Sequence, residues 1–216
     1  MSSLKFGTSG LRGLVTELTD AVCFAYSTAF LQHLLANGLA AGSTVLVGQD
    51  LRFSSPRIAK ACMAAVDALG MTVENCGALP TPALALRAMM LKVPAIMVTG
   101  SHIPADRNGL KFYRPDGEID KADEAEINRR VAEPVQAKAG LEQVANLAAS
   151  QGYLARCLSI LPKNALTGKR IGVYLHSSVA RDVMMEIVTA LGAVAIPLGY
   201  SDEFVPFDTE ALRPED

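Results

Sequence analysis

The sequence predicts an α/β fold, a doubly wound mixed sheet sandwiched by helices, and three observations support this. Half of the 216 residues are hydrophobic and only 6% are aromatic, so aliphatic side chains supply most of a sizeable core. Short β-branched runs alternate with longer segments of helical periodicity up to Lys111. Residues that begin or end helices lie at the boundaries of these segments. This alternation is typical of strands connected by helices.

Helix boundaries define most of the expected elements. Thr19 is a suitable N-cap for a helix that Asn37-Gly38 would end. Ser55-Pro56 and Thr81-Pro82 each combine a hydroxyl with a proline at a helix start. The predicted helices are 20–37, 55–69, 81–93, 121–131, 141–161 with an interruption at 151–152, and 178–191; the predicted strands are 44–48, 71–76, 95–98, 111–113, 167–175 and 193–197.

We expect two domains, 1–150 and 151–216. The composition changes around Lys138-Ala139-Gly140, and a second strand–helix–strand unit begins near Thr167. Residues 151–216 are few for a complete doubly wound domain, so we expect the truncated start of a second, similar α/β domain. Its sheet would expose an edge, which a homodimer would cover.

Charge and cysteine content narrow the choice of function. A formal net charge of −2 leaves no broad basic face for nucleic acid, although a local cationic pocket is compatible with it. The four cysteines are scattered, and Cys23 and Cys62 fall in predicted helices, as core cysteines of a reducing compartment do. No segment resembles a signal peptide or a membrane span. We therefore expect a cytoplasmic protein without a nucleic-acid or membrane partner.

The stretch from Thr99 to Lys111 is the first candidate site. It follows the apolar strand 95–98 and contains Ser101 and His102 before Asn108-Gly109. We expect one irregular loop here, because loops at strand ends carry the sites of α/β proteins.

Ser101 has three interpretations. A hydrolase nucleophile is disfavoured, because Thr99 and Ile103 stand where a G-x-S-x-G elbow has glycines. A phosphate carrier would need cations and backbone N–H groups, which Lys111, Arg12 and the Gly100 turn could supply. The third alternative is a serine that only satisfies backbone groups in a turn.

The neighbouring polar residues leave similar alternatives open. His102 is either a solvated loop histidine or a proton donor beside a phosphoserine. Lys111 is either a surface charge or a group that binds phosphate and moves protons. Asp50 and Arg52 either form a solvated turn pair or line the same strand-end crevice as Ser101.

Glycines at every third position mark the segment from Phe6 to Gly13, which includes Arg12. This spacing suits either a turn that points N–H groups at an anion or a simple turn before a strand. A dinucleotide fingerprint is excluded, because the G-x-G pair is missing.

Four motifs, taken in order, resemble the α-D-phosphohexomutase superfamily, in particular its bacterial phosphomannomutase/phosphoglucomutase group. They are Phe6-Gly7-Thr8-Ser9-Gly10-Leu11-Arg12-Gly13, Val47-Gly48-Gln49-Asp50-Leu51-Arg52 with Ser54-Ser55-Pro56, Thr99-Gly100-Ser101-His102-x-Pro104, and Asn108-Gly109-Leu110-Lys111. Each is modest alone, whereas the ordered set is specific. The resemblance covers the whole chain.

The resemblance implies reversible transfer of phosphate between the 1- and 6-positions of a hexose phosphate. Ser101 would be the phosphorylated serine, with a hexose 1,6-bisphosphate as intermediate and activator. Arg12, Lys111 and His102 match the family's catalytic and acid/base positions beside this serine. The residues assigned to phosphate and substrate binding are Ser9, Arg52, Gly100 and Asn108.

The resemblance also implies one Mg²⁺, held in part by the phosphate on Ser101. The family's metal loop, D-G-D-x-D-R, does not occur in the sequence, although Phe204 to Glu210 resembles the segment that precedes it. We therefore expect an N-terminal piece of a chain of about 450 residues. Ile103 departs from the family's usual Asn, and Ser9 stands where the glucosamine-phosphate branch has Asp.

A free-standing, non-catalytic module that binds a phosphosugar or a protein partner is the alternative function. Under either hypothesis we expect the 216-residue chain alone to lack mutase activity, because it encodes too few Mg²⁺ ligands and cannot enclose a sugar. A coupled assay with glucose 1-phosphate tests this expectation. Measurable turnover by the purified chain would contradict it.

Overall fold

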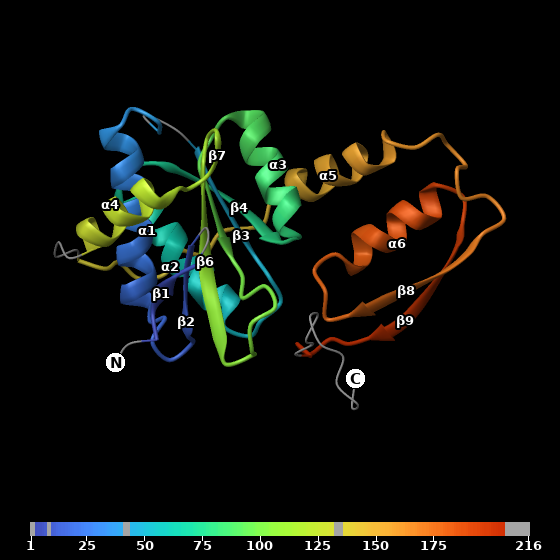
Figure 1. Ribbon diagram of the computed structural model, residues 1–216, viewed down its shortest axis with the longest axis horizontal. Coiled ribbons are helices and arrows are strands. Elements are labelled where there is room, and N and C mark those ends of the chain that lie inside the picture. The colour runs from blue at the N-terminus through green and yellow to red at the C-terminus, as the bar shows by residue number, and fades with distance from the viewer. Residues whose placement is uncertain (1–2, 8–9, 41–43, 132–135, 206–216) are drawn as a thin grey trace.

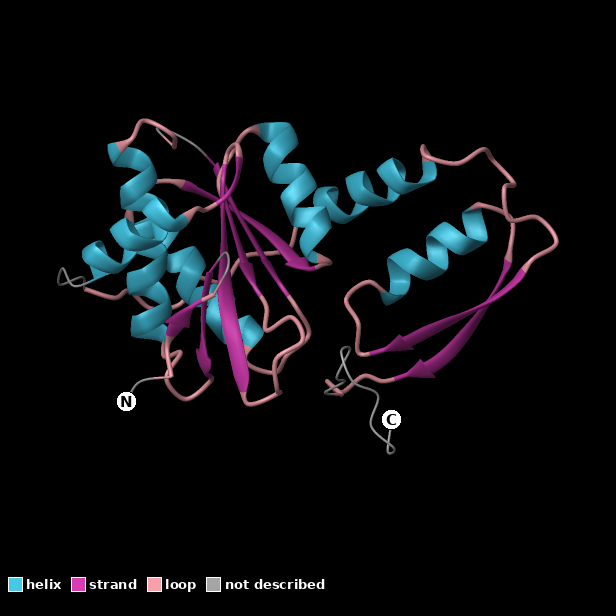
Figure 2. Cartoon of the chain, viewed as in Figure 1, coloured by secondary structure: helices cyan, strands magenta, loops and turns pink. Residues whose placement is uncertain are grey.

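The computed structural model describes residues 3–7, 10–40, 44–131 and 136–205. Its larger unit is a mixed seven-stranded sheet between helices, and a smaller strand–helix–strand unit follows (Figures 1 and 2). The strands of the large sheet lie in the order β1-β2-β6-β5-β3-β4, with β7 paired to β6. This confirms the predicted fold class.

The elements have the following bounds. The strands are β1 (Lys5–Phe6), β2 (Gly10–Leu14), β3 (Thr44–Gln49), β4 (Thr72–Ala78), β5 (Ala95–Val98), β6 (Arg107–Arg114), β7 (Gly117–Glu118), β8 (Arg170–His176) and β9 (Val194–Tyr200). The helices are α1 (Asp20–Ala36), α2 (Ser55–Ala68), α3 (Thr81–Leu91), α4 (Lys121–Val131), α5 (Ala148–Leu158) and α6 (Arg181–Ala190).

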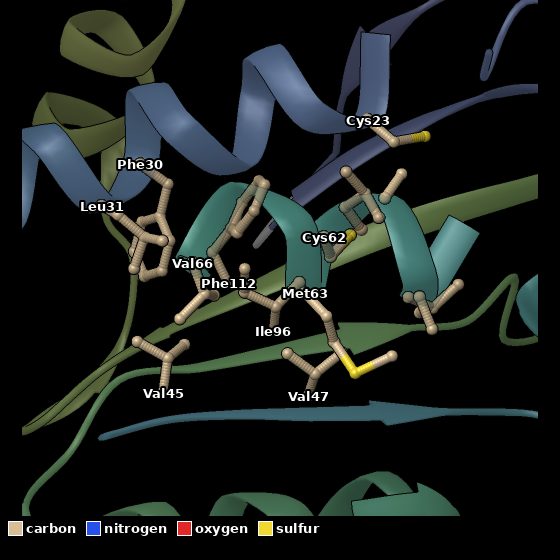
Figure 3. Close-up of a cluster of buried hydrophobic side chains, with 14 of the residues drawn as sticks. Cys23, Phe30, Leu31, Val45, Val47, Cys62, Met63, Val66, Ile96 and Phe112 are labelled. Atoms are coloured by element: carbon tan, nitrogen blue, oxygen red, sulfur yellow. The ribbon is translucent and has the colours of Figure 1, made fainter. Parts of the chain in front are cut away.

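The main core lies between the sheet and the layer formed by α1, α2 and α4. Alternate strand residues point into it, among them Val47, Ile96 and Phe112 (Figure 3). Phe30 of α1 packs on Phe112 with 4.8 Å between ring centroids. A tilted aromatic pair of this kind adds to the burial of both rings.

The opposite face of the sheet carries a second core. Leu46, Ala95 and Met97, each one residue away from a side chain of the first core, pack here with Leu84 of α3. The alternation is the two-residue period of a strand buried on both faces. The helices α2 and α3 therefore connect parallel strands across opposite faces of one sheet.

The smaller unit consists of the parallel strands β8 and β9, with α6 packed on one face. Its core is built around Val173, Leu175 and Val188. The helix α5 contacts both α3 and α6, and so joins the two units (Figure 1). Along the described part of the chain, no helix has the length and apolar character that crossing a membrane requires.

The helices begin close to the predicted positions, but not all of the predicted side-chain caps are present. The hydroxyl of Thr19 accepts a hydrogen bond from the backbone N–H of Val22 and caps α1, as predicted. The hydroxyl of Ser55 instead donates to Asp50, and α3 follows Pro80 without a side-chain cap. Proline at the first turn therefore marks these two helices better than the hydroxyl does.

Three expectations about local structure are wrong. The loop after β5 ends at Asp106, because the strand expected over 111–113 already begins at Arg107, so Asn108 and Gly109 are strand residues and not loop residues. The helix expected over 141–161 covers only Ala148–Leu158, and it continues through Gln151-Gly152 without interruption. Local composition gave no signal for the pairing of β6 with β2 and β5, and that pairing extends the strand. The boundary expected near Ser150 falls inside α5 and stays a prediction.

We predict that Phe112→Ala destabilises the larger unit by about 3–5 kcal/mol, because it removes a fully buried ring from the main core. Urea unfolding followed by circular dichroism measures the change. Phe53→Ala is the matched control, since that ring is 72% exposed and its loss should change stability by no more than about 0.5 kcal/mol. Equal effects of the two substitutions would contradict this account of the core.

Candidate active site

The carboxyl ends of β3 and β5 meet at one edge of the sheet. These strands are parallel neighbours, and Gln49 pairs with Val98 at their ends. The loops 50–54 and 99–106 leave the sheet from this point. Because α2 and α3 cover opposite faces, this edge is a topological switch point, where open α/β sheets bind their ligands.

Ser101 lies on the second of these loops with its side chain exposed. Its φ is 53°, in the left-handed region that residues with a Cβ seldom adopt. Its backbone N–H donates to the hydroxyl of Thr99 at 3.0 Å. Its own Oγ lies 3.3 Å from Nδ1 of His102. The loop therefore presents a hydroxyl and an imidazole side by side.

A cavity of about 380 Å³ opens in front of Ser101. Its lining residues come from five segments, and they are Gly10, Leu11, Arg12, Thr81, Thr99, Ser101, Leu110, Lys111 and Glu118. Ser101, Arg12 and Lys111 were each predicted from the sequence, and the structure brings them to one cavity. A hydroxyl facing two cationic side chains suits a phosphate group.

The pairing of β2 with β6 brings Arg12 and Lys111 to this cavity. In its antiparallel register Gly10 lies opposite Lys111, and Arg12 lies opposite Gly109. A Cβ on Gly10 would overlap the carbonyl oxygen of Leu110, and one on Gly109 would lie 2.6 Å from the carbonyl oxygen of Leu11. Glycine is therefore required at both positions for the strands to approach this closely.

Lys111 is held by an acidic partner at the edge of the cavity. Its Nζ donates to Oε1 of Glu118 at 2.7 Å and lies 5.5 Å from the centroid of the Tyr113 ring. Partial burial opposes the charged form, but the hydrogen bond to Glu118 and the nearby Tyr113 outweigh it and raise the pKa of Lys111. Lys111 is therefore an ammonium cation at neutral pH.

Arg52, expected to bind phosphate, lies beneath the Ser101 loop and does not line the cavity. It is 2% exposed, and its guanidinium donates hydrogen bonds to the backbone of that loop. Its Nε lies 3.4 Å from the carboxylate of Asp50. Arg52 is therefore buried beside a partly buried Asp50, and the two are not a solvated turn pair.

Two other residues expected to bind phosphate also have structural partners. The side chain of Asn108 is fully buried and donates to the hydroxyls of Ser54 and Ser55 at 2.8 and 2.9 Å. The backbone N–H of Gly100 donates to Asp50 at 3.1 Å. Ser9, the fourth expected ligand, lies outside the described residues.

Two residues that line the cavity were missed by the sequence analysis. Thr81 begins α3 at the end of β4, and a search of every strand end would have found it. Glu118 reaches the cavity because β7 folds back on β6 after the turn at Arg114-Pro115-Asp116-Gly117. This turn is visible in the sequence, but the contact between Glu118 and Lys111 depends on the register of the hairpin.

The described residues do not form a Mg²⁺ site by themselves. Within the described ranges, no three His, Cys, Asp or Glu side chains gather around a point that could hold a metal ion. Glu118 at the cavity is hydrogen-bonded to Lys111, and Asp50 is hydrogen-bonded below the loop to Ser55 and Gly100. A phosphate on Ser101 would add oxygen ligands for Mg²⁺ at this cavity.

Fold and site together define an α/β/α domain with a cationic cavity at its strand ends that suits a phosphorylated ligand. Residues 3–138 match the family model described as phosphoglucomutase/phosphomannomutase, alpha/beta/alpha domain I. The chain belongs to this family.

Two curated relatives are phosphomannomutases. The one from Sinorhizobium fredii (strain NBRC 101917 / NGR234) is 51% identical, and the match covers 96% of this chain and 45% of the relative. The one from Salmonella muenchen is 48% identical, with coverage of 100% and 44%. A phosphoglucosamine mutase of Granulibacter bethesdensis is 32% identical, with coverage of 92% and 45%. The chain thus spans less than half the length of the curated relatives it matches.

Solved structures agree with this family. A Thermus thermophilus protein assigned as a phosphomannomutase superposes with a TM-score of 0.78 at 26% identity, over 95% of this chain and 48% of that one. A phosphoglucomutase/phosphomannomutase family protein from Burkholderia thailandensis gives a TM-score of 0.69 at 25% identity, over 88% and 43%.

We predict that Glu118→Gln lowers the pKa of Lys111, because the neutral amide no longer stabilises the ammonium charge. A larger fraction of neutral amine at a given pH should speed acylation of Lys111. Peptide mass spectrometry over a pH series measures this rate. Glu124→Gln is the matched control, since Glu124 pairs with Lys121 on α4 and should leave Lys111 unaffected. An unchanged pH profile for Lys111 would show that Glu118 does not control its charge.

Proposed function

We propose that the protein is a phosphohexomutase of the phosphomannomutase/phosphoglucomutase group. It would transfer phosphate reversibly between the 1- and 6-positions of a hexose phosphate. The observation that carries this proposal is the cavity at which Ser101, Arg12 and Lys111 meet. Membership of the family and the phosphomannomutase relatives at 48 and 51% identity support the same activity.

The reaction would proceed in two phosphoryl transfers. In the first, the bond between phosphorus and Ser101 Oγ breaks as a bond forms to a free hydroxyl of the hexose phosphate. The hydroxyl loses its proton and Ser101 regains one, so the product is a hexose 1,6-bisphosphate and a free serine. The sugar then reorients and returns its other phosphate to Ser101.

Most of the rate enhancement would come from positively charged side chains that stabilise the transition state and from the correct positioning of the reacting groups. The transition state of phosphoryl transfer is loose, and negative charge spreads over the equatorial oxygens. Arg12 and the ammonium of Lys111 face the space where this charge develops. Lys111 can also return a proton to Ser101 Oγ as the phosphate leaves, and His102 is next to the same oxygen.

The remaining residues fall into two groups under this proposal. Ser9 stays a proposed phosphate ligand. Gly100, Asn108 and Arg52 support the loop from below, because their polar groups are hydrogen-bonded within the protein. Mg²⁺ would add positive charge at the phosphate on Ser101, with its further ligands from outside the described residues. A hexose 1,6-bisphosphate would load that phosphate as the activator.

Two further proposals concern the cellular location and the oligomeric state of the protein. A cytoplasmic location is supported by four cysteines that are all free, three of them buried. A homodimer is supported by the two-stranded β8–β9 sheet, whose edges are unpaired within the described residues. The ligand bound at the active site would be a small-molecule substrate, a hexose phosphate.

We predict that Ser101→Ala in the full-length gene product lowers mutase turnover to background, because no hydroxyl remains to carry phosphate. Incubation with glucose 1,6-bisphosphate and peptide mapping should place one phosphate on Ser101 of the wild-type protein. Ser159→Ala is the control. Ser159 is exposed, lies at the C-terminal end of α5, and is far along the chain from the residues that line the cavity. Full turnover by Ser101→Ala would refute the proposal. A wild-type protein that binds hexose phosphates without phosphorylation of Ser101 would instead support the non-catalytic module.

A further inference from the structure

A buried cation lies directly beneath the Ser101 loop. We propose that Arg52 is a positioning residue for Ser101: its guanidinium clamps the loop from below and holds Ser101 toward the cavity. The catalytic consequence rests on the proposed function, whereas the clamp itself is a property of the loop and can be tested separately.

Four backbone carbonyls accept hydrogen bonds from Arg52. Nη1 donates to the carbonyl oxygens of Pro104 and Arg107 at 2.7 and 3.0 Å. Nη2 donates to those of Ser101 and Ile103 at 3.2 and 2.5 Å. One rigid, planar group therefore binds the loop at its start, middle and end. A flexible lysine ammonium, with three donors on one atom, cannot reproduce this spread.

Asp50 completes the clamp at the base of the loop. Its Oδ2 lies 3.4 Å from Nε of Arg52 and accepts the backbone N–H of Gly100 at 3.1 Å. Its Oδ1 accepts the backbone N–H of Arg52 and the hydroxyl of Ser55. The carboxylate thus balances the buried cation and binds the residue just before Ser101.

The backbone around Ser101 depends on this clamp. A Cβ on Gly100 would overlap the guanidinium of Arg52, so the loop lies directly against it. Ser101 has a left-handed φ of 53°, which is unfavourable for a residue with a Cβ. Such a conformation persists when the surroundings determine it, and the carbonyl of Ser101 is one of the four acceptors of Arg52.

Arg52 is 2% exposed and is not among the residues that line the cavity. The Phe204 ring, from the segment after β9, lies over the guanidinium with its centroid 4.8 Å from Cζ. This segment is held by Ser177, whose Oγ accepts the backbone N–H of Val205 at 2.9 Å. Arg52 therefore has the loop on one side and an aromatic ring on another, which fits a positioning role and not a phosphate ligand.

Arg52→Lys in the full-length gene product tests the proposal. Lysine keeps the positive charge and most of the side-chain volume, but it lacks the planar guanidinium whose two terminal nitrogens donate to the loop. We expect faster amide hydrogen exchange confined to residues 99–107. With hexose phosphate as substrate, we expect kcat to fall about 100-fold, as misplacement of a reacting group predicts, with KM nearly unchanged. Asp50→Asn should act in the same direction with a smaller effect, since one amide oxygen remains to accept hydrogen bonds.

Arg129→Lys on α4 is the matched control, and we expect neither exchange nor turnover to change in it. Unchanged exchange in residues 99–107 of a folded Arg52→Lys protein would overturn the clamp. A raised KM with an unchanged kcat would overturn the positioning role and assign Arg52 to phosphate binding. If the wild-type protein is never phosphorylated at Ser101, the proposed function fails, and the exchange measurement still decides whether Arg52 holds the loop.

Discussion

The close pairing of β2 with β6 is the constraint on which the rest of the site depends. Gly10 and Gly109 leave room for two backbones to approach, and the resulting register places Arg12 and Lys111 beside one cavity. The strand β6 also pairs with β5, which leads directly into the Ser101 loop. One strand thus connects the N-terminal motif, the lysine and the serine, although these segments are far apart in the chain.

The cations around the loop divide into two functional kinds. Arg12 and Lys111 line the cavity, where they can meet a ligand. Arg52 is buried on the other side of the loop and bound to backbone carbonyls. A phosphate ligand needs cations that it can reach, and Arg12 and Lys111 at the cavity provide them. The unfavourable backbone conformation at Ser101 needs hydrogen bonds that hold it in place, and the buried Arg52 provides those.

The smaller unit contributes to the same region through its last described segment. Phe204 lies over Arg52, while Ser177 and Arg181 bind the backbone of this segment at Val205 and Ser201. The strand-end loops of the two units therefore meet beneath the Ser101 loop. The smaller unit therefore contacts the larger one at two places, through α5 on α3 and through Phe204 on Arg52.

The sequence by itself determined the α/β class, most helix and strand positions, and Ser101, Arg12 and Lys111 as candidates. These features follow from local signals, namely hydrophobic period, helix caps and ordered short motifs. Only the tertiary structure decided that β6 begins at Arg107, that Glu118 pairs with Lys111, and that Arg52 is buried against the loop and does not line the cavity. The physical reason is that strand register and burial depend on contacts between distant segments, and the local sequence does not encode which side of a loop a long side chain will occupy.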